Sequence, residues 1–164
     1  MNLLKATPIN IKDIMKIMAE ARGAQRAAGF VQWKDNYPSA DIIESDIADG
    51  TGYILDDGGH IAGYVAIAFS DSEYDRHRHL WDTEVKYAVM HRIAIGDNYR
   101  GKGCSRALFD LSESLVASKG VRYIRIDTGI DNRPMQHILS SRNYTCLGEC
   151  DFVWGPRLAY EKKI

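Results

Sequence analysis

An apolar run that leads through glycines into an amphipathic helix limits the folds open to this sequence. Residues 87–95, YAVMHRIAI, predict a buried strand. The segment DNYRGKG follows at residues 97–103, and the helix expected after it buries a stripe made by Leu108, Leu111, Leu115 and Val116. Gly120 ends that helix, and residues 122–128 predict the next strand. Together these elements form a strand–helix–strand crossover.

The N-terminal part predicts a strand followed by two helices. Residues 3–6 form a short strand. A helix is expected after Pro8, because apolar residues recur with helical spacing at Ile11, Ile14, Met15 and Met18. Either Gly23 or Gly29 ends this helix, and Ser39 is the N-cap of the second one.

The middle of the chain predicts a β-hairpin and a loop. Residues 52–55 and 60–69 are its strands, joined by the turn DDGG at residues 56–59. Residues 70–84 are charged and predict a loop that could gate a site. After the crossover, Asn132 caps a short helix that has Pro134 in its first turn.

The C-terminal part predicts further strands. Strand character is found in residues 145–150, TCLGEC, and in residues 152–155, FVWG. A turn is predicted at Gly155-Pro156, and a returning strand follows it in residues 157–163, RLAYEKK. Hairpins combined with crossovers indicate a mixed α/β fold, with a central sheet and helices on both faces. The length of 164 residues argues for a single domain over residues 1–164.

Composition excludes several classes of partner. The 21 basic and 22 acidic residues give a formal charge of -1, so neither nucleic acid nor a membrane surface is an expected partner. No secretory signal is expected at the N-terminus. The three cysteines are an odd number at loose spacing, which indicates reduced thiols and a cytoplasmic location.

The glycine-rich segment indicates a phosphate ligand. A helix N-terminus offers N–H groups and partial positive charge, glycine allows close approach, and Arg100 and Lys102 add charge. The segment does not fit the P-loop, because its lysine lies between the glycines. It does not fit the dinucleotide fingerprint either, because Arg106 takes the place of the third glycine. The alternatives are a plain helix cap or a structural phosphate-binding domain.

Two motifs resemble those of the GNAT acetyltransferases. The acetyl-CoA motif of that family is Arg/Gln-x-x-Gly-x-Gly/Ala, and Arg100 and Gly103 match its first two fixed positions, with Ser105 at the third. A second motif, Asn-x-x-Ala-x-x-Leu-Tyr closing with Gly-Phe, is similar to NRPMQHIL, where Asn132 matches. The other positions depart from it: Met135, Ile138, Leu139 and Asn143-Tyr144.

The resemblance implies a GNAT-like sheet that is mostly antiparallel, with a splayed strand pair that holds the arm of acetyl-CoA. It also implies the residues that contact this cofactor: Ile93, Ala94, Ile95, Arg100, Gly101, Lys102, Gly103, Cys104, Ser105 and Asn132. By the same resemblance, the N–H groups of residues 101–105 are expected to hold the pyrophosphate of acetyl-CoA. Asn132 either contacts the pantetheine or only caps its helix.

The implied activity is transfer of an acetyl group to a primary amine by direct attack in a ternary complex. His91 is the first candidate for the base, because it shares strand parity with Ile93 and an imidazole titrates near ~6.5. Glu84 and Asp127 are alternative bases, and His91 could equally be silent. The tetrahedral oxyanion needs a donor, and the resemblance suggests a backbone N–H near Ile93 or Ala94.

The family often has a tyrosine acid at the position of Leu139, and leucine cannot donate a proton. Tyr144 or a water could serve instead, or Tyr144 packs in the core. This departure motivates an alternative function, a CoA-binding sensor or regulatory module without catalysis. Lookalikes of the family suggest a homodimer.

The acceptor side is predicted at the aromatic segment FVQWKDNYP. Trp33 and Tyr37 pack around a small-molecule or peptide amine, with Asp35 attracting its charge, or they form a hydrophobic plug. Asp127 binds substrate or anchors the end of its strand.

No metal site is expected. His77 and His79 resemble ligands only superficially, because no cysteine or second cluster is near them in the sequence. Cys146 and Cys150 are interpreted as ordinary apolar residues.

Overall fold

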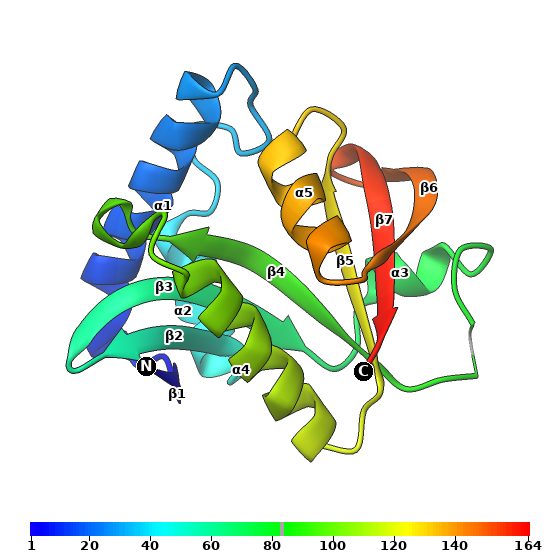
Figure 1. Cartoon of the computed structure of the whole chain (residues 1–164), viewed down its shortest axis with the longest axis horizontal. Coiled ribbons are helices and arrows are strands. Elements are labelled where there is room, and N and C mark those ends of the chain that lie inside the picture. The colour runs from blue at the N-terminus through cyan, green and yellow to red at the C-terminus, as the bar shows by residue number, and fades with distance from the viewer. Residues whose placement is uncertain (83) are drawn as a thin grey trace. The chain divides into compact units, whose positions relative to one another are not determined.

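The computed structural model describes residues 1–82 and 84–164, and its strands form one mixed sheet (Figure 1). The strand order is β1-β2-β3-β4-β5-β7-β6. Pairing is antiparallel for β1 with β2, β2 with β3, β5 with β7 and β6 with β7, and parallel for β4 with β5. The strands are β1 Asn2–Lys5, β2 Gly52–Asp57, β3 His60–Ala68, β4 Tyr87–Ile95, β5 Tyr123–Gly129, β6 Thr145–Phe152 and β7 Gly155–Lys163.

The helices follow the predicted order with one addition. They are α1 Ile11–Ala27, α2 Ala40–Ala48, α3 Ser72–Arg76, α4 Cys104–Ser118 and α5 Arg133–Ser141, with short 3-10 turns η1 Pro8–Asn10 and η2 Asp97–Tyr99. The Ser39 hydroxyl accepts the Ile42 N–H and caps α2, as predicted. The chain continues through Gly23, and α1 ends just before Gly29, whose φ is 84°. No helix in the described part of the chain is long and apolar enough to cross a membrane.

Two loop predictions are corrected. The predicted loop at residues 70–84 contains α3, because the Asp71 carboxylate accepts the N–H groups of Glu73 and Tyr74 and caps a helix there. The predicted turn at Gly155-Pro156 lies two residues earlier, at Val153 and Trp154. Both turn residues are exposed, whereas Phe152 before them is buried and ends β6.

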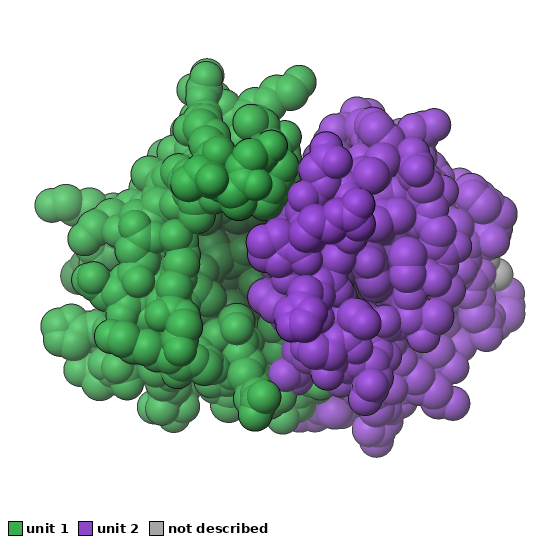
Figure 2. Space-filling view, turned by 45° about the horizontal axis from the view of Figure 1, so that its top comes forward, with its two compact units in different colours: residues 1–67, 91–115 green, residues 68–90, 116–164 purple. Residues whose placement is uncertain are grey.

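The fold divides into two compact units (Figure 2). Unit 1 comprises Met1–Ile67 and His91–Leu115, and unit 2 comprises Ala68–Met90 and Val116–Ile164. Each unit has its own apolar core. The core of unit 1 includes Ile14, Met18, Trp33, Ile43, Ile54, Tyr64 and Ala94, and that of unit 2 includes Tyr74, Trp81, Val89, Cys150, Phe152 and Ala159.

Strand β4 and helix α4 each run through both units. The parallel ladder pairs Tyr87–Val89 of β4 with the first three residues of β5, all within unit 2. From His91 onward, β4 belongs to unit 1. Arg92 follows with φ 54°, a left-handed conformation that is rare in a strand. The regular ladder of β4 with β5 therefore precedes an irregular residue in β4.

Candidate functional site

The glycine-rich segment is fixed to unit 1 at its start. The Gly96 N–H donates to the Ala62 carbonyl over 3.0 Å, which ties the end of β4 to β3. The Asp97 N–H donates to the Glu20 carboxylate on α1 over 2.8 Å. The segment therefore leaves the sheet at a defined point, and η2 carries it toward α4.

Two glycines in this segment have left-handed backbone. Gly101 has φ 72° and Gly103 has φ 78°. An added Cβ at either position would meet no atom within 4 Å, so conformation rather than crowding requires glycine here. The surrounding space leaves the backbone of residues 101–103 open to a ligand.

Helix α4 begins directly after these glycines. The Gly103 carbonyl accepts the Ala107 N–H over 3.1 Å, so the preceding N–H groups of the first turn have no acceptor within the helix. These groups and the helix dipole favour an anion. Lys102 is exposed beside them, whereas Arg100 forms an ion pair with Asp97 at 2.6 Å. Cys104 is buried, and Ser105 is half-buried.

The second half of β4 contains the predicted base and the predicted cofactor contacts of this strand. His91, Ile93 and Ile95 are half-buried, and Ala94 is buried. The left-handed Arg92 interrupts the alternation of side chains between His91 and Ile93. Strand parity therefore gives no support to His91 as the base.

Sequence reasoning missed a buried charge cluster in unit 1. The Arg92 guanidinium donates to both Asp46 carboxylate oxygens, at 2.8 Å and 2.5 Å, and the Tyr64 hydroxyl donates to the same carboxylate at 2.7 Å. Burial and the nearby Asp46 carboxylate raise the pKa of Tyr64 well above its usual value. The sequence signal that could have revealed this cluster was Asp46 itself. It follows Ile43 by three residues, so the helical spacing places this carboxylate on the buried apolar face of α2.

The predicted acceptor residues differ in exposure. Trp33 is buried in the core of unit 1, and its backbone N–H donates to the Gln25 side chain. Tyr37 is exposed, packs edge-on against Trp33 at 6.2 Å and lies 3.3 Å from the Arg92 guanidinium. Asp35 pairs with Arg26. Trp33 thus matches the plug alternative, and Tyr37 keeps an exposed ring.

The remaining predicted residues lie in unit 2. Asp127 accepts from Tyr74 at 2.7 Å and Trp154 at 3.1 Å, with Arg157 at 3.4 Å, which matches the strand-anchor alternative. Tyr144 is buried, as the core alternative expects. Glu84 is exposed. Asn132 caps α5 by accepting the Met135 N–H at 3.1 Å.

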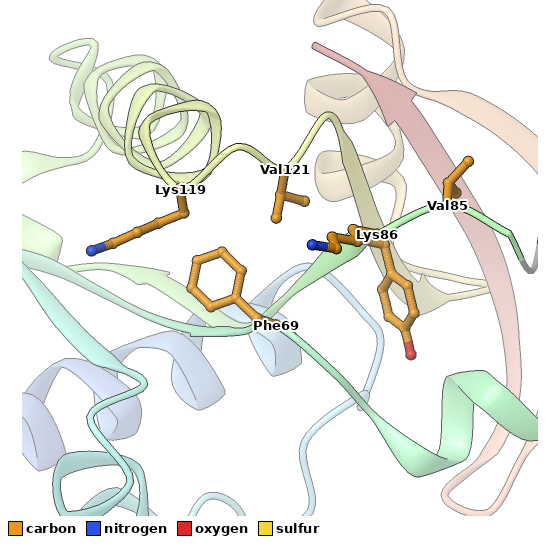
Figure 3. Close-up of a pocket in the computed structure, with 6 residues that line it drawn as sticks. Phe69, Val85, Lys86, Lys119 and Val121 are labelled. Atoms are coloured by element: carbon orange, nitrogen blue, oxygen red, sulfur yellow. The ribbon is translucent and has the colours of Figure 1, made fainter.

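Unit 2 has a surface pocket of about 560 Å³ (Figure 3). Apolar side chains form much of its lining, with two lysines beside them: Phe69, Val85, Tyr87, Val121, Lys86 and Lys119. None of the predicted site residues lines this pocket.

Cys150 lies in the apolar core of unit 2, as predicted, but it is also a neighbour of His77. The sequence shows no cysteine near His77, but the fold brings the Cys150 Sγ to 3.0 Å from the His77 Nδ1. The 73 residues that separate them in the chain hide this neighbour from any local pattern.

Comparison with known proteins assigns the fold. The sequence model of the acetyltransferase (GNAT) family matches residues 14–143. A GNAT-family acetyltransferase structure from Streptococcus agalactiae is 31% identical, with a TM-score of 0.84 over 99% of this chain and 95% of that one. A GNAT-family structure from Listeria monocytogenes is 23% identical, with a TM-score of 0.77 over 99% and 94%.

A third similar structure contains a cofactor. It is the PaiA N-acetyltransferase from Thermoplasma acidophilum in complex with coenzyme A, with 11% identity and a TM-score of 0.73 over 99% of this chain and 98% of that one. The comparison with curated proteins finds no match.

Proposed function

The chain belongs to the acetyltransferase (GNAT) family, and we propose that it transfers the acetyl group of acetyl-CoA to a primary amine of a small molecule or peptide. The observation that carries the cofactor assignment is the open loop of left-handed glycines at the start of α4. The coenzyme A complex of a structural relative supports it.

The pyrophosphate is proposed to lie against the backbone N–H groups of residues 101–105. Lys102 supplies the exposed positive charge, because Asp97 already pairs with Arg100. Ile93, Ala94 and Ile95 are proposed to line the pantetheine arm, which pairs with the edge of β4. The Asn132 side-chain oxygen already accepts the Met135 N–H in the helix cap, so its role does not require a contact with the cofactor.

Acetyl transfer by direct attack requires little of the protein. The amine must lose a proton, for which His91 and Glu84 remain the proposed bases, directly or through water. A backbone N–H at Ile93 or Ala94 is proposed to stabilise the tetrahedral oxyanion. The thiolate of CoA then leaves. Leu139 and Tyr144 are both buried, so departure is proposed to need no side-chain acid at either position.

The first test is thermal unfolding of the full chain with acetyl-CoA, with ADP and without ligand. A ligand at about 100 times its dissociation constant adds about 2.7 kcal/mol to the unfolding free energy, which raises the midpoint by several degrees. We expect a clearly larger shift with acetyl-CoA than with ADP. Equal midpoint shifts with the two ligands would mean that the loop is a generic phosphate site without preference for acetyl-CoA.

The loop assignment is tested by Lys102→Ala, because substitutions at Gly101 or Gly103 would also strain the backbone. Loss of one charge-assisted contact of about 1.4 kcal/mol weakens acetyl-CoA binding about tenfold. Lys12→Ala, at an exposed position of α1, is the matched control. Equal affinities of the two variants would contradict the loop assignment.

Release of the CoA thiol with a panel of amines separates the enzyme from its alternative. The alternative is a CoA-binding sensor, favoured by the buried leucine at position 139, where the family often has tyrosine. Turnover of any amine excludes a sensor without catalysis. Acetyl-CoA binding with no turnover across small and peptide amines would favour the sensor.

A further inference from the structure

Three metal-ligating side chains meet within unit 2, outside the proposed acetyl-CoA site. His77 is the C-cap residue of α3, His79 follows two residues later, and Cys150 lies near the end of β6. Figure 1 shows both elements, α3 and β6. One ligand atom from each lies within 4.8 Å of the others. Two imidazoles and one thiolate form a donor set that zinc prefers.

The Cys150 and His77 ligand atoms have nearly the spacing of two ligands on one ion. The Cys150 Sγ lies 3.0 Å from the His77 Nδ1. Zn–S and Zn–N bonds of about 2.3 and 2.0 Å at a tetrahedral angle separate sulfur from nitrogen by about 3.5 Å. A shift of a few tenths of an ångström therefore opens room for an ion between these atoms. The His79 ring lies 6.0 Å from the His77 ring, centroid to centroid.

The outer contacts of His77 suit a metal ligand. The Glu73 carboxylate lies 3.3 Å from the His77 Nε2 and is itself fixed by the Val153 N–H at 2.7 Å. A hydrogen bond from Nε2–H to this carboxylate leaves the lone pair of Nδ1 facing Cys150. Carboxylate–histidine–metal arrangements of this kind orient the ring and strengthen the ligand.

Packing and charge also suit a divalent ion. The Phe152 ring packs on His77 with centroids 4.8 Å apart, and Cys150 is buried. A divalent ion on one thiolate carries a net charge of about +1, and the Glu73 carboxylate, which also pairs with Arg76 at 3.3 Å, is a neighbouring negative charge. His79 is exposed and leaves that side of the cluster open to solvent.

We propose that His77, His79 and Cys150 bind one zinc-type divalent ion, with water at the fourth position. Zinc has no redox role in this site, and its fourth position is open to exchange. Binding replaces the Sγ proton of Cys150, which passes to solvent. The ion joins the segment after α3 to β6. Acetyl-CoA binding does not depend on it, so the two proposals stand or fall separately.

The test uses the full chain, stripped with a chelator and titrated with cobalt(II) chloride and then zinc chloride. We expect a thiolate-to-cobalt charge-transfer band, tetrahedral d–d bands and one ion per chain, with zinc displacing cobalt. Absence of the charge-transfer band would overturn the proposal and leave Cys150 and His77 as a hydrogen-bonded pair only.

Variants identify the ligands. Cys150→Ser is expected to abolish the charge-transfer band, and His79→Ala to weaken zinc binding at least tenfold. His79 is exposed, so its substitution keeps the fold even where that of buried Cys150 does not. The matched controls are Cys146→Ser, at an exposed cysteine of the same strand, and His137→Ala, at an exposed position of α5.

The controls make the result decisive. If His79→Ala kept the charge-transfer band and bound zinc with the affinity of the wild type, the three-ligand site would be contradicted. Loss of the band in Cys146→Ser would assign the metal to a different cysteine and overturn the proposal. Thermal unfolding gives a second readout, because at one zinc concentration the midpoint of the wild type and of both controls should rise more than that of His79→Ala.

Discussion

One carboxylate, that of Asp46, holds the buried Tyr64 and the half-buried Arg92 of unit 1. Its side chain is 9% exposed and that of its partner Arg92 is 15% exposed. Removing one member of a buried pair leaves the other charge uncompensated, which costs about 3–5 kcal/mol. We predict that Asp46→Ala lowers the unfolding free energy by about this amount, measured by urea denaturation.

The matched control is Asp49→Ala, at an exposed position just after α2. This change should stay within about 0.5 kcal/mol of the wild type. Equal losses in the two variants would show that the buried pair contributes no more than a surface carboxylate.

Tyr87 gives the stability of unit 2 a dependence on alkaline pH. Burial and the hydrogen bond to Asp75 raise the pKa of Tyr87 from 10.0 to about 12. The folded chain therefore keeps the phenol proton where the unfolded chain loses it. The stabilisation is complete below pH 10.0 and is lost as the pH rises toward about 12.

We predict that Tyr87→Phe makes the unfolding free energy fall less steeply over this pH range. Asp75→Asn should act in the same direction, because it removes the carboxylate that accepts the Tyr87 hydroxyl at 2.6 Å. Urea denaturation at a series of pH values measures both slopes. A slope identical to that of the wild type in both variants would assign the alkaline loss to other groups.

Single residues were predictable where the backbone fixes the choice. Gly101 and Gly103 have the left-handed conformation that glycine favours, so their role was visible in the sequence. The Arg92–Asp46 pair was not, because its partners are 46 positions apart in the chain and only the folded structure brings α2 and β4 together there.

At the scale of elements, Asn132 decides how α5 begins. Its side chain accepts the Met135 N–H, and it is buried at 8% exposure. We predict that Asn132→Ala lowers the unfolding free energy by about 1 kcal/mol through loss of this cap. Asn132→Ser, which retains a capping oxygen, should recover most of the loss.

Acetyl-CoA affinity separates the two roles considered for Asn132. Because the cap occupies its side-chain oxygen, isothermal titration should give the same affinity for both variants as for the wild type. A loss of affinity in Asn132→Ala that Asn132→Ser does not restore would instead support contact with the pantetheine.

Elements with strong local signals were predicted well. Periodic apolar residues and caps gave α1, α2, α4 and α5, and the hairpin turn has positive φ at both Gly58 and Gly59. Helix α3 was missed because five residues are too short to be stable alone. It depends on Tyr74, which is fully buried and stacks on Trp81 at 5.4 Å.

At the scale of the whole molecule, the sequence indicated one mixed α/β domain but not its strand order. The order places β7 between β5 and β6, which no local pattern specifies. The two compact units were equally hidden, because each combines segments from distant parts of the chain. Two compact units could unfold separately or in one transition.

The continuity of β4 and α4 through both units predicts that the two units do not unfold separately. Strand β4 passes from unit 2 to unit 1 after Met90, and helix α4 passes from unit 1 to unit 2 after Leu115. Unfolding either unit alone would break a helix and a strand in their interiors. We therefore expect one cooperative transition for residues 1–164.

Tryptophan fluorescence can follow each unit. Trp33 is buried in unit 1 and Trp81 in unit 2, at 8% and 6% exposure, whereas Trp154 is 42% exposed. In Trp81→Phe/Trp154→Phe only Trp33 reports, and in Trp33→Phe/Trp154→Phe only Trp81 reports. Within each variant, urea curves from fluorescence and from far-UV circular dichroism should share one midpoint, with Trp154→Phe alone as the control. Fluorescence that precedes the dichroism in one variant and follows it in the other would mean two independently unfolding domains.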